Sequence, residues 1–336
     1  MNDSSGLPSH RLPPAAGLLA GCLTVWALMA AAAFLVVTSP TPARAQGPNI
    51  DGGNAYLFGG NFKSFKVKTS GAEINGVIGG KGPPVLLLHG YPQSHVSWSL
   101  VASELAKDYT VVVTDLRGYG DSSKPPGGKD HAEYSKRAMA QDQVEVMKHF
   151  GFDKFAAVGH DRGGRVVHRM ALDHADKVTK AAVLDIIPTS HFYQHVTQES
   201  ATAYYHWFFL LQPNAEKLIE SNLELFVRSD KSPLSKEYLR TFSLPGTVHA
   251  ACEDYRAGAT IDLRHDQEDQ GKKVACPLLV LWAKNGPMGR LFDVPATWRE
   301  RASDVSDQSQ ALPGGHNLPE GSPKEVTASL QAFLRP

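Results

Sequence analysis

Residues 155–165 read FAAVGHDRGGR, and this short stretch sets the expectation for the whole chain. Its apolar beginning predicts a buried strand at 155–158, followed by Gly159, and a helical pattern runs from about Gly163 to His174. A strand, a sharp Gly-rich turn and a helix form the context of a nucleophile elbow, which exposes the side chain at the turn. That side chain is Asp161, where elbow motifs carry serine.

Apolar runs on both sides of this stretch extend the pattern into a sheet. Residues 85–88 are apolar throughout, residues 110–113 read TVVV, and strand character returns at 181–186 and 277–282. Strands that are apolar at every position are typical of a parallel sheet that helices cover on both faces. Helical patterns occur at 98–105, 134–150 and 323–334. The sequence therefore predicts an α/β protein with a mostly parallel, doubly wound sheet.

The alternation of strands and helices breaks at Pro188. Residues 190–260 are rich in aromatic side chains and have a helical sequence pattern, with no continuous apolar run that would indicate a buried strand. We therefore expect a helical cap at 190–260, inserted between two parts of the core, 46–189 and 261–336. The site should lie in the crevice between cap and core, because open α/β sheets and domain junctions bind ligands there.

The first 45 residues differ from the rest of the chain. No charged residue occurs at 15–37, and the A-x-A pattern at 43–45 is typical of an export signal cleaved before Gln46. The prediction is an export signal at 1–45 and a periplasmic protein. The apolar run is also long enough to span a bilayer, so a membrane anchor that is not cleaved is the alternative.

Composition argues against several classes of partner. The 336-residue chain carries 34 basic and 34 acidic residues. This balance argues against binding to nucleic acid or an anionic membrane, since such binding normally leaves a basic excess. Two of the three cysteines, Cys252 and Cys276, follow the leader, and neither has Cys or His at metal-ligand spacing. They are expected as buried free thiols, and no metal site is predicted.

Three side chains are candidates for covalent hydrolytic chemistry. Asp161 is already ionised, so it can displace a leaving group from carbon and form an ester, although a helix N-cap is the alternative. His316 lies in the Gly-rich loop LPGGHN before the last helix. Its near-neutral pKa suits the base that activates water against the ester. Asp185, at the end of the strand after the elbow helix, would orient the imidazole, and Asp293 is the competitor.

Backbone and guanidinium groups around the elbow complete the predicted site. The HGYP loop at 89–92 can present an N–H toward Asp161, with Tyr91 against the substrate. The N–H of Arg162 would be the second donor to an oxyanion. The side chains of Arg162 and Arg165 keep the nucleophile ionised and offer planar forks to an anion. The predicted substrate is a small carboxylate that bears a leaving group.

These motifs resemble the α/β-hydrolase superfamily and, within it, the haloacetate (fluoroacetate) dehalogenases. The resemblance covers about 80–334. It rests on HGYP, DLRGYGDS (115–122), GHDRGGR (159–165), HWFF (206–209), CEDYRAGATID (252–262) and the GGHNLPE block around His316. The loop GPMG at 286–289 has no counterpart that we can match. The resemblance implies the α/β-hydrolase fold with an inserted helical cap.

The resemblance also implies roles for the site residues. The nucleophile, the base and the orienting acid would be Asp161, His316 and Asp185. The substrate carboxylate would bind Arg162 and Arg165. The departing halide would lie in a pocket made by His206, Trp207 and Tyr255. In physical terms, their N–H and O–H groups can replace the water that surrounds the ion in solution.

The expected function is hydrolytic dehalogenation of short 2-haloacids, from haloacetate to glycolate and halide, with no metal or organic cofactor. The partner would be a small anionic haloacid, and a homodimer is the default assembly. Two alternatives stay open. In an epoxide hydrolase of the same fold, the cap tyrosines Tyr204, Tyr205 and Tyr255 would serve as acids. A non-catalytic member of the fold would only bind its ligand.

Overall fold

The computed structural model describes residues 53–227 and 230–335. The predicted export segment, residues 1–45, lies outside the described residues, so export to the periplasm and the alternative membrane anchor stay predictions. Within the described ranges, no helix is both long enough and apolar enough to cross a membrane. Cys252 is buried and Cys276 is partly exposed, and both are free thiols.

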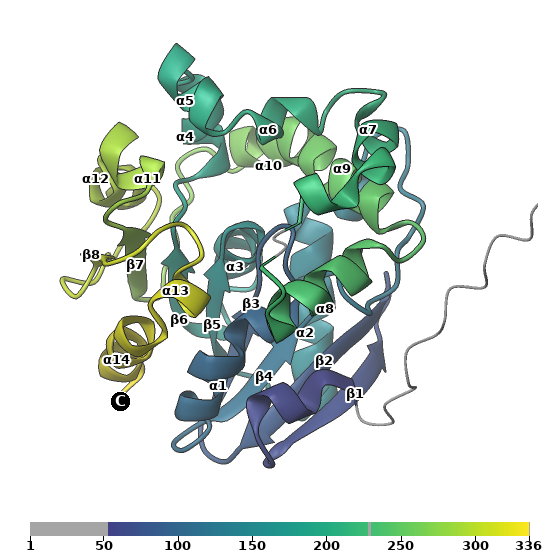
Figure 1. The fold of residues 1–336 in the computed structure, drawn as a ribbon. Helices are drawn as coiled ribbons and strands as arrows, with labels where there is room; N and C mark the ends of the chain where they lie inside the picture. The colour runs from purple at the N-terminus through teal and green to yellow at the C-terminus, as the bar shows by residue number, and fades with distance from the viewer. Residues whose placement is uncertain (1–52, 228–229, 336) are drawn as a thin grey trace, which may run out of the picture. The chain divides into compact units, whose positions relative to one another are not determined.

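An eight-stranded sheet forms the core (Figure 1). Its strands are β1 (Phe62–Lys68), β2 (Glu73–Gly80), β3 (Pro84–Leu88), β4 (Thr110–Thr114), β5 (Phe155–His160), β6 (Val178–Leu184), β7 (Leu278–Ala283) and β8 (Gln310–Leu312). They lie in the order β1-β2-β4-β3-β5-β6-β7-β8. Both pairings of β2, with β1 and with β4, are antiparallel, and all later pairings are parallel. The predicted α/β class with a mostly parallel sheet is confirmed.

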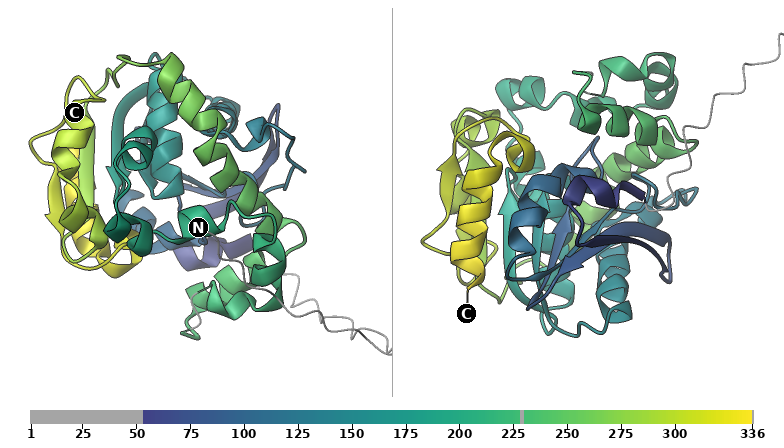
Figure 2. Two further views of the ribbon diagram at one scale, coloured as in Figure 1. Left: turned by 90° about the horizontal axis from the view of Figure 1, so that it is seen from above. Right: turned by 60° about the horizontal axis from the view of Figure 1, so that its bottom comes forward.

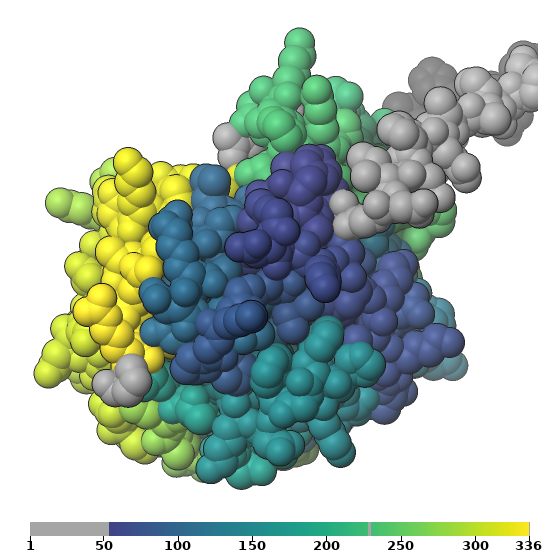
Figure 3. All heavy atoms as spheres, turned by 90° about the horizontal axis from the view of Figure 1, so that it is seen from below, coloured from purple at the N-terminus to yellow at the C-terminus, as the bar shows by residue number. Residues whose placement is uncertain are grey.

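Helices cover both faces of this sheet because the central strands are buried on both sides. The helices of the core are α1 (Ser99–Leu105), α2 (Lys136–His149), α3 (Arg162–Asp173), α11 (Pro287–Leu291), α12 (Val294–Arg299), α13 (Leu318–Gly321) and α14 (Pro323–Leu334). Short 3-10 turns occur at η1 (Gly53–Phe58), η2 (His95–Trp98), η3 (Ala132–Tyr134) and η4 (Leu223–Leu225). Helix α1 packs on α14, and α2 packs on α3. In Figure 3, α14 in yellow lies beside the blue and purple segments that contain α1 and the first strands.

Strand β6 differs from its prediction. It was expected at 181–186 and forms three residues earlier, over Val178–Leu184. The strand ends before Asp185 because that residue adopts a φ of 53°, outside the extended region. The polar residues Thr179 and Lys180 concealed its beginning, although β6 pairs with β5 from Val178 onward.

Seven further helices lie between β6 and β7, at one end of the sheet (Figures 1 and 2). They are α4 (Thr189–Gln194), α5 (Gln198–Ala203), α6 (His206–Phe209), α7 (Ala215–Ser221), α8 (Pro233–Phe242), α9 (Thr247–Ala259) and α10 (Ile261–Glu268). Figure 2 shows these helices in green, gathered on one side of the core. The helical run continues to Glu268, so the division of the chain at residue 260 stays a prediction.

Candidate active site

A tight turn at the carboxyl end of β5 presents Asp161, directly before α3. The backbone of Asp161 has φ 48° and ψ −117°, a conformation that costs a non-glycine residue about 1–3 kcal/mol. Glycines make the turn possible, because a Cβ on Gly159 or Gly163 would lie 2.3 or 2.4 Å from a backbone oxygen. The Asp161 side chain makes no capping hydrogen bond to α3. The alternative role as a helix cap therefore finds no support.

The Asp161 carboxylate lies between a backbone donor and an imidazole. Its Oδ1 accepts a hydrogen bond from the Tyr91 N–H at 2.9 Å, and its Oδ2 lies 3.7 Å from His316 Nε2. Only 6% of the residue is exposed. The structure thus brings the HGYP loop, the elbow and the late Gly-rich loop together around one carboxylate.

The other side of the His316 ring contacts Asp185. His316 Nδ1 lies 2.6 Å from Asp185 Oδ2, and the Ala283 N–H donates to Asp185 Oδ1 at 2.8 Å. This second bond fixes the buried carboxylate against the imidazole. The competitor, Asp293, instead caps α12, where its Oδ1 accepts from the Ala296 N–H at 3.0 Å. The structure therefore pairs His316 with Asp185 and not with Asp293.

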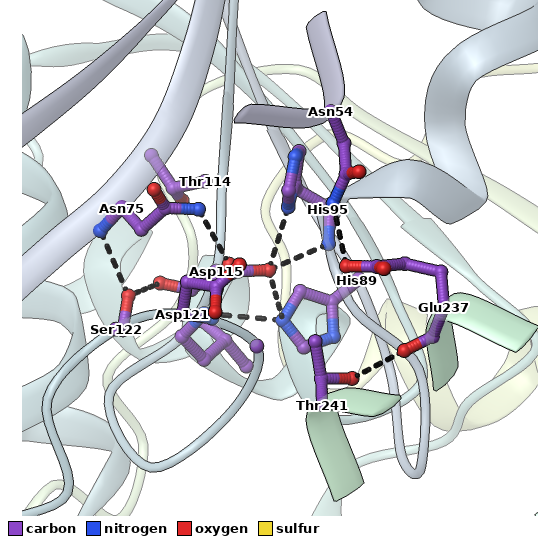
Figure 4. Close-up of polar contacts among 12 residues, drawn as sticks. Asn54, Asn75, His89, His95, Thr114, Asp115, Asp121, Ser122, Glu237 and Thr241 are labelled. Atoms are coloured by element: carbon purple, nitrogen blue, oxygen red, sulfur yellow. Dashed lines mark hydrogen bonds and ion pairs between the residues drawn. The ribbon is translucent and has the colours of Figure 1, made fainter. Parts of the chain in front are cut away.

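A buried polar network holds the HGYP loop behind the elbow, and Figure 4 shows two imidazoles turned toward Asp115. His89 Nε2 accepts from the Leu116 N–H at 3.1 Å, so the ring proton lies on Nδ1, which is 2.8 Å from the Gly90 oxygen. Burial lowers the pKa of His89, so this ring is neutral. The Asp115 carboxylate accepts from the N–H and from Nδ1 of His95, at 2.8 and 2.9 Å. His89 is therefore a support for the loop.

Arg165 is a buried cation that bonds to no carboxylate in the described part of the chain. Its Nη1 donates to the Ile187 oxygen and to Thr189 Oγ1, both at 3.0 Å. The guanidinium carbon lies 4.3 Å from the centre of the Trp207 ring, and Nε has no hydrogen-bond partner among described residues. Burial lowers the pKa of Arg165 to about 10, so the side chain stays charged at neutral pH. A cation of this kind suits an anionic ligand.

Arg162, in contrast, is already paired. Its Nε donates to Asp254 Oδ2 at 2.8 Å, and its Nη2 donates to Asp254 Oδ1 and to the Asp254 backbone oxygen, both at 2.7 Å. The side chain is 1% exposed and is not among the residues that line the cavity described next. The structure therefore separates two arginines that the resemblance groups together.

A cavity of about 340 Å³ lies at the elbow, between core and cap. The predicted site residues that line it are Tyr91, Asp161, Arg165, Asp185, His206, Trp207, Tyr255 and His316. Its other lining residues are Pro92, Ala203, Tyr204, Tyr205, Leu225, Phe226, Pro287, Met288 and Asn317. The hydroxyl groups of Tyr204 and Tyr255 are buried and have no hydrogen-bond partner in residues 53–227 and 230–335. Such groups can donate to a ligand.

The charges of the site favour an ionised nucleophile and a basic imidazole. Burial opposes ionisation of Asp161, but the neighbouring imidazoles and guanidinium groups, His316 first, hold its pKa well below the usual value. Burial also lowers the pKa of His316, but the hydrogen bond and charge of Asp185 outweigh it and raise that pKa. Burial lowers the pKa of His206 to about 4, so its ring is neutral at pH 7.

The sequence reasoning missed several residues of this site. His160 Nε2 lies 2.8 Å from the His316 backbone oxygen, and the two rings are 4.8 Å apart. Its position next to the elbow was the available signal. Pro287 and Met288, from the unmatched GPMG loop, also line the cavity. That loop follows a buried strand, and the carboxyl ends of parallel strands meet at one edge, so its position could have been predicted.

The fold and this arrangement of side chains are those of the α/β hydrolases, and comparisons with known proteins agree with this class. The family model described as "alpha/beta hydrolase fold" matches residues 83–323. A crystal structure of a protein from Nostoc sp PCC 7120, assigned to the α/β hydrolases, is 55% identical in sequence. It has a TM-score of 0.79 and covers 82% of this chain and 98% of its own.

Two characterised relatives are similar over most of the chain. The fluoroacetate dehalogenase of Burkholderia sp is 45% identical over 288 residues, which are 81% of this chain and 94% of that protein. The soluble epoxide hydrolase of Corynebacterium sp. (strain C12) is 33% identical over 294 residues, 80% of this chain and 95% of its own length. The chain belongs to the α/β-hydrolase superfamily and, within it, to the haloacetate dehalogenase family.

Proposed function

We propose that this α/β hydrolase removes halide from short 2-haloacids by way of an ester on Asp161. One observation carries the proposal: a buried, ionised carboxylate at the elbow shares a cavity with Arg165, a cation that bonds to no carboxylate among the described residues. The similarity to a fluoroacetate dehalogenase supports the same substrate class. The substrate would be a small anion.

In the first step, an oxygen of Asp161 attacks the α-carbon of the haloacid. A carbon–oxygen bond forms, the carbon–halogen bond breaks with inversion, and the halide leaves with the electron pair. Arg165 would hold the substrate carboxylate, and the N–H and O–H groups of His206, Trp207 and Tyr255 would surround the halide. Burial raises the pKa of Tyr255 well above its usual value, which supports a protonated donor there.

In the second step, water hydrolyses the ester. His316 Nε2 takes a proton from water, and the water oxygen attacks Cγ of Asp161. The hydrogen bond from the Tyr91 N–H supports Oδ1 as the ester carbonyl oxygen, since the same donor would stabilise the oxyanion that develops there. The Arg162 N–H is the proposed second donor. The bond between Cγ and the ester oxygen then breaks, and His316 returns its proton to the departing oxygen, so the 2-hydroxy acid leaves with an oxygen that came from Asp161.

The pKa of His316 should differ between the two steps, because the charge of Asp161 changes when the ester forms. Before alkylation, the negative charge of Asp161 contributes to the raised pKa of His316. The ester is neutral, so its formation removes this contribution while the effect of burial remains. The pKa of His316 should therefore fall when the ester forms, which favours the neutral base when water must be activated.

A trapping experiment tests the ester. The variant His316→Asn lacks the base, so it should react once with chloroacetate and keep the ester. Mass spectrometry should then find added mass on the peptide that contains Asp161. In the wild-type protein, a single turnover in ¹⁸O-labelled water should put the label into Asp161 first. Direct entry of the label into the product, with no label in the enzyme, would contradict the route.

A second candidate is epoxide hydrolysis. The hydroxyl groups of Tyr204 and Tyr255, which are buried and have no hydrogen-bond partner among the described residues, favour it, because two phenols can protonate the oxygen of an opening epoxide ring. The 33% identity to the soluble epoxide hydrolase of Corynebacterium sp. supports this candidate, but it is lower than the 45% identity to the fluoroacetate dehalogenase. Arg165 argues against it, since a neutral epoxide has no use for a buried cation. Assays of chloroacetate and styrene oxide side by side distinguish the two functions.

A further inference from the structure

Behind the cavity, four buried charged side chains and one phenol form a closed cluster around Asp254. Its members, all at most 5% exposed, are Tyr119, Lys136, Arg162, Asp254 and Asp262. Asp254 receives three hydrogen bonds from Arg162, one from Tyr119 at 2.7 Å and one from Lys136. Lys136 Nζ also lies 3.4 Å from Asp262 Oδ2, and the Lys136 N–H donates to Asp262 Oδ1 at 2.8 Å. Two positive and two negative charges balance.

Helix α9 contacts the guanidinium group of Arg162 in three ways. Asp254 binds its Nε and Nη2. The guanidinium carbon lies 4.2 Å from the centre of the Tyr255 ring. A Cβ at Gly258 would lie 3.2 Å from Nη2, so this position of the helix has room only for glycine without a shift. One helix of the cap therefore sets the orientation of a side chain that begins at the elbow.

We propose that Asp254 is a positioning residue for carboxylate recognition, one that fixes Arg162 and takes up its charge. This inference rests on the proposed function. With Nε and Nη2 held, Nη1 is the nitrogen of Arg162 that Asp254 does not bind. Since the cluster is neutral, the charge that selects an anion comes from Arg165, whose bonds go to an oxygen of the backbone and a hydroxyl group.

The cluster also links carboxylate recognition to the halide pocket. Tyr255 follows Asp254 in α9, packs on Arg162 and lines the cavity, and its hydroxyl group has no hydrogen-bond partner in the part of the chain that the structure describes. A shift of the guanidinium would therefore move this hydroxyl as well. Asp254 acts on both ends of the substrate without touching it.

Two double variants separate positioning from simple structural support. Asp254→Asn with Lys136→Met removes one charge of each sign and loosens Arg162. Asp262→Asn with Lys136→Met removes the same charges and leaves the Arg162 contacts intact. Both variants keep the net charge of the cluster at zero, and the first alone separates the buried Arg162 from its carboxylate. We expect the first variant to raise KM for chloroacetate about tenfold with a smaller change in kcat, because charge-assisted hydrogen bonds are the stronger kind. The second should keep the wild-type KM within about twofold.

A titration with acetate, an unreactive carboxylate, gives a readout that does not need turnover. The quenching of tryptophan fluorescence can follow binding, since Trp207 lies against Arg165. The acetate Kd should rise about tenfold in the double variant that carries Asp254→Asn and stay near the wild-type value in the one that carries Asp262→Asn. Equal KM and Kd in the two double variants would overturn the positioning role. If the wild-type protein binds acetate but releases no halide, the proposed function fails and the comparison of Kd values still decides the role of Asp254. If it does neither, both proposals fail.

Discussion

His316 lies between the two acids of the proposed site. Its Nδ1 contacts Asp185 and its Nε2 faces Asp161, so one imidazole joins a buried acid to the proposed nucleophile. The geometry explains why Asp185 and Asp161 have different proposed roles. Asp185 is bonded to the ring and to a backbone N–H, whereas Asp161 lines the cavity and its Oδ2 receives no hydrogen bond from the backbone of residues 53–227 and 230–335.

At this scale we predict the pH dependence of turnover. His316 must be neutral to accept a proton, so kcat should fall as the pH drops through its pKa. The Asp185 carboxylate raises that pKa. Asp185→Asn should therefore move the acid limb of the kcat profile to lower pH and reduce kcat at pH 8 about 100-fold. Rates of halide release from pH 5 to pH 9 measure both effects.

Asp293→Asn is the matched control, because Asp293 caps α12 and does not contact His316. Asparagine is as good an N-cap as aspartate, so the variant should keep both the stability and the pH profile of the wild type. A shift of the acid limb in this variant, or none in Asp185→Asn, would contradict the assignment of the acid.

At the scale of elements, the turn between β5 and α3 depends on close backbone contact. A Cβ at Gly163 would lie 2.4 Å from the Leu88 oxygen and 2.5 Å from the His89 oxygen, and neither backbone atom can move freely, since Leu88 ends β3 and the His89 oxygen accepts from the Gly163 N–H. Gly163→Ala should therefore lower the free energy of unfolding by about 3 kcal/mol. Gly60→Ala should change it by less than about 0.5 kcal/mol, since nothing lies within 4 Å of a Cβ there.

Denaturation with urea measures both variants. Equal midpoints would show that the elbow tolerates a methyl group and that the contacts at the turn are not tight. The elbow could be predicted from the sequence because its strand, its glycines and its helix all lie between Phe155 and Asp173.

At the scale of the whole molecule, cap and core share buried charges. Asp254 of α9 binds the buried Arg162 and Lys136 of the core, and Glu253 also contacts the partly exposed ring of His131 at 2.7 Å. Opening the cap alone would separate these pairs, and breaking one buried pair costs about 3–5 kcal/mol. We therefore predict that cap and core unfold together. Native-state hydrogen exchange should give the amides of α9 and β5 the same opening free energy, and earlier opening of α9 would contradict this.

Processing of the predicted export segment, residues 1–45, also concerns the whole molecule. A charge-free stretch at 15–37 followed by A-x-A at 43–45 predicts cleavage after Ala45. N-terminal sequencing of the exported protein should therefore begin at Gln46. Retention of the leader in a membrane fraction would instead support the anchor.

The sequence by itself determined the α/β class, the order of the buried strands along the chain and the position of Asp161 at the elbow. These features follow from hydrophobic periodicity and turn chemistry, which act over a few residues. Periodicity does not report polar residues at the beginning of a strand, which is why β6 was expected three residues late.

Only the tertiary structure decided which charges meet. Arg162 and Arg165 look equivalent in the chain, yet Asp254, 92 residues away from Arg162, neutralises one and leaves the other for a ligand. The tertiary structure likewise pairs His316 with Asp185, which is 131 residues away in the chain, and places Asp293 at the end of a helix. The physical reason is that a buried ion pair forms where packing brings two groups within about 3 Å and excludes water, and no local pattern encodes that distance.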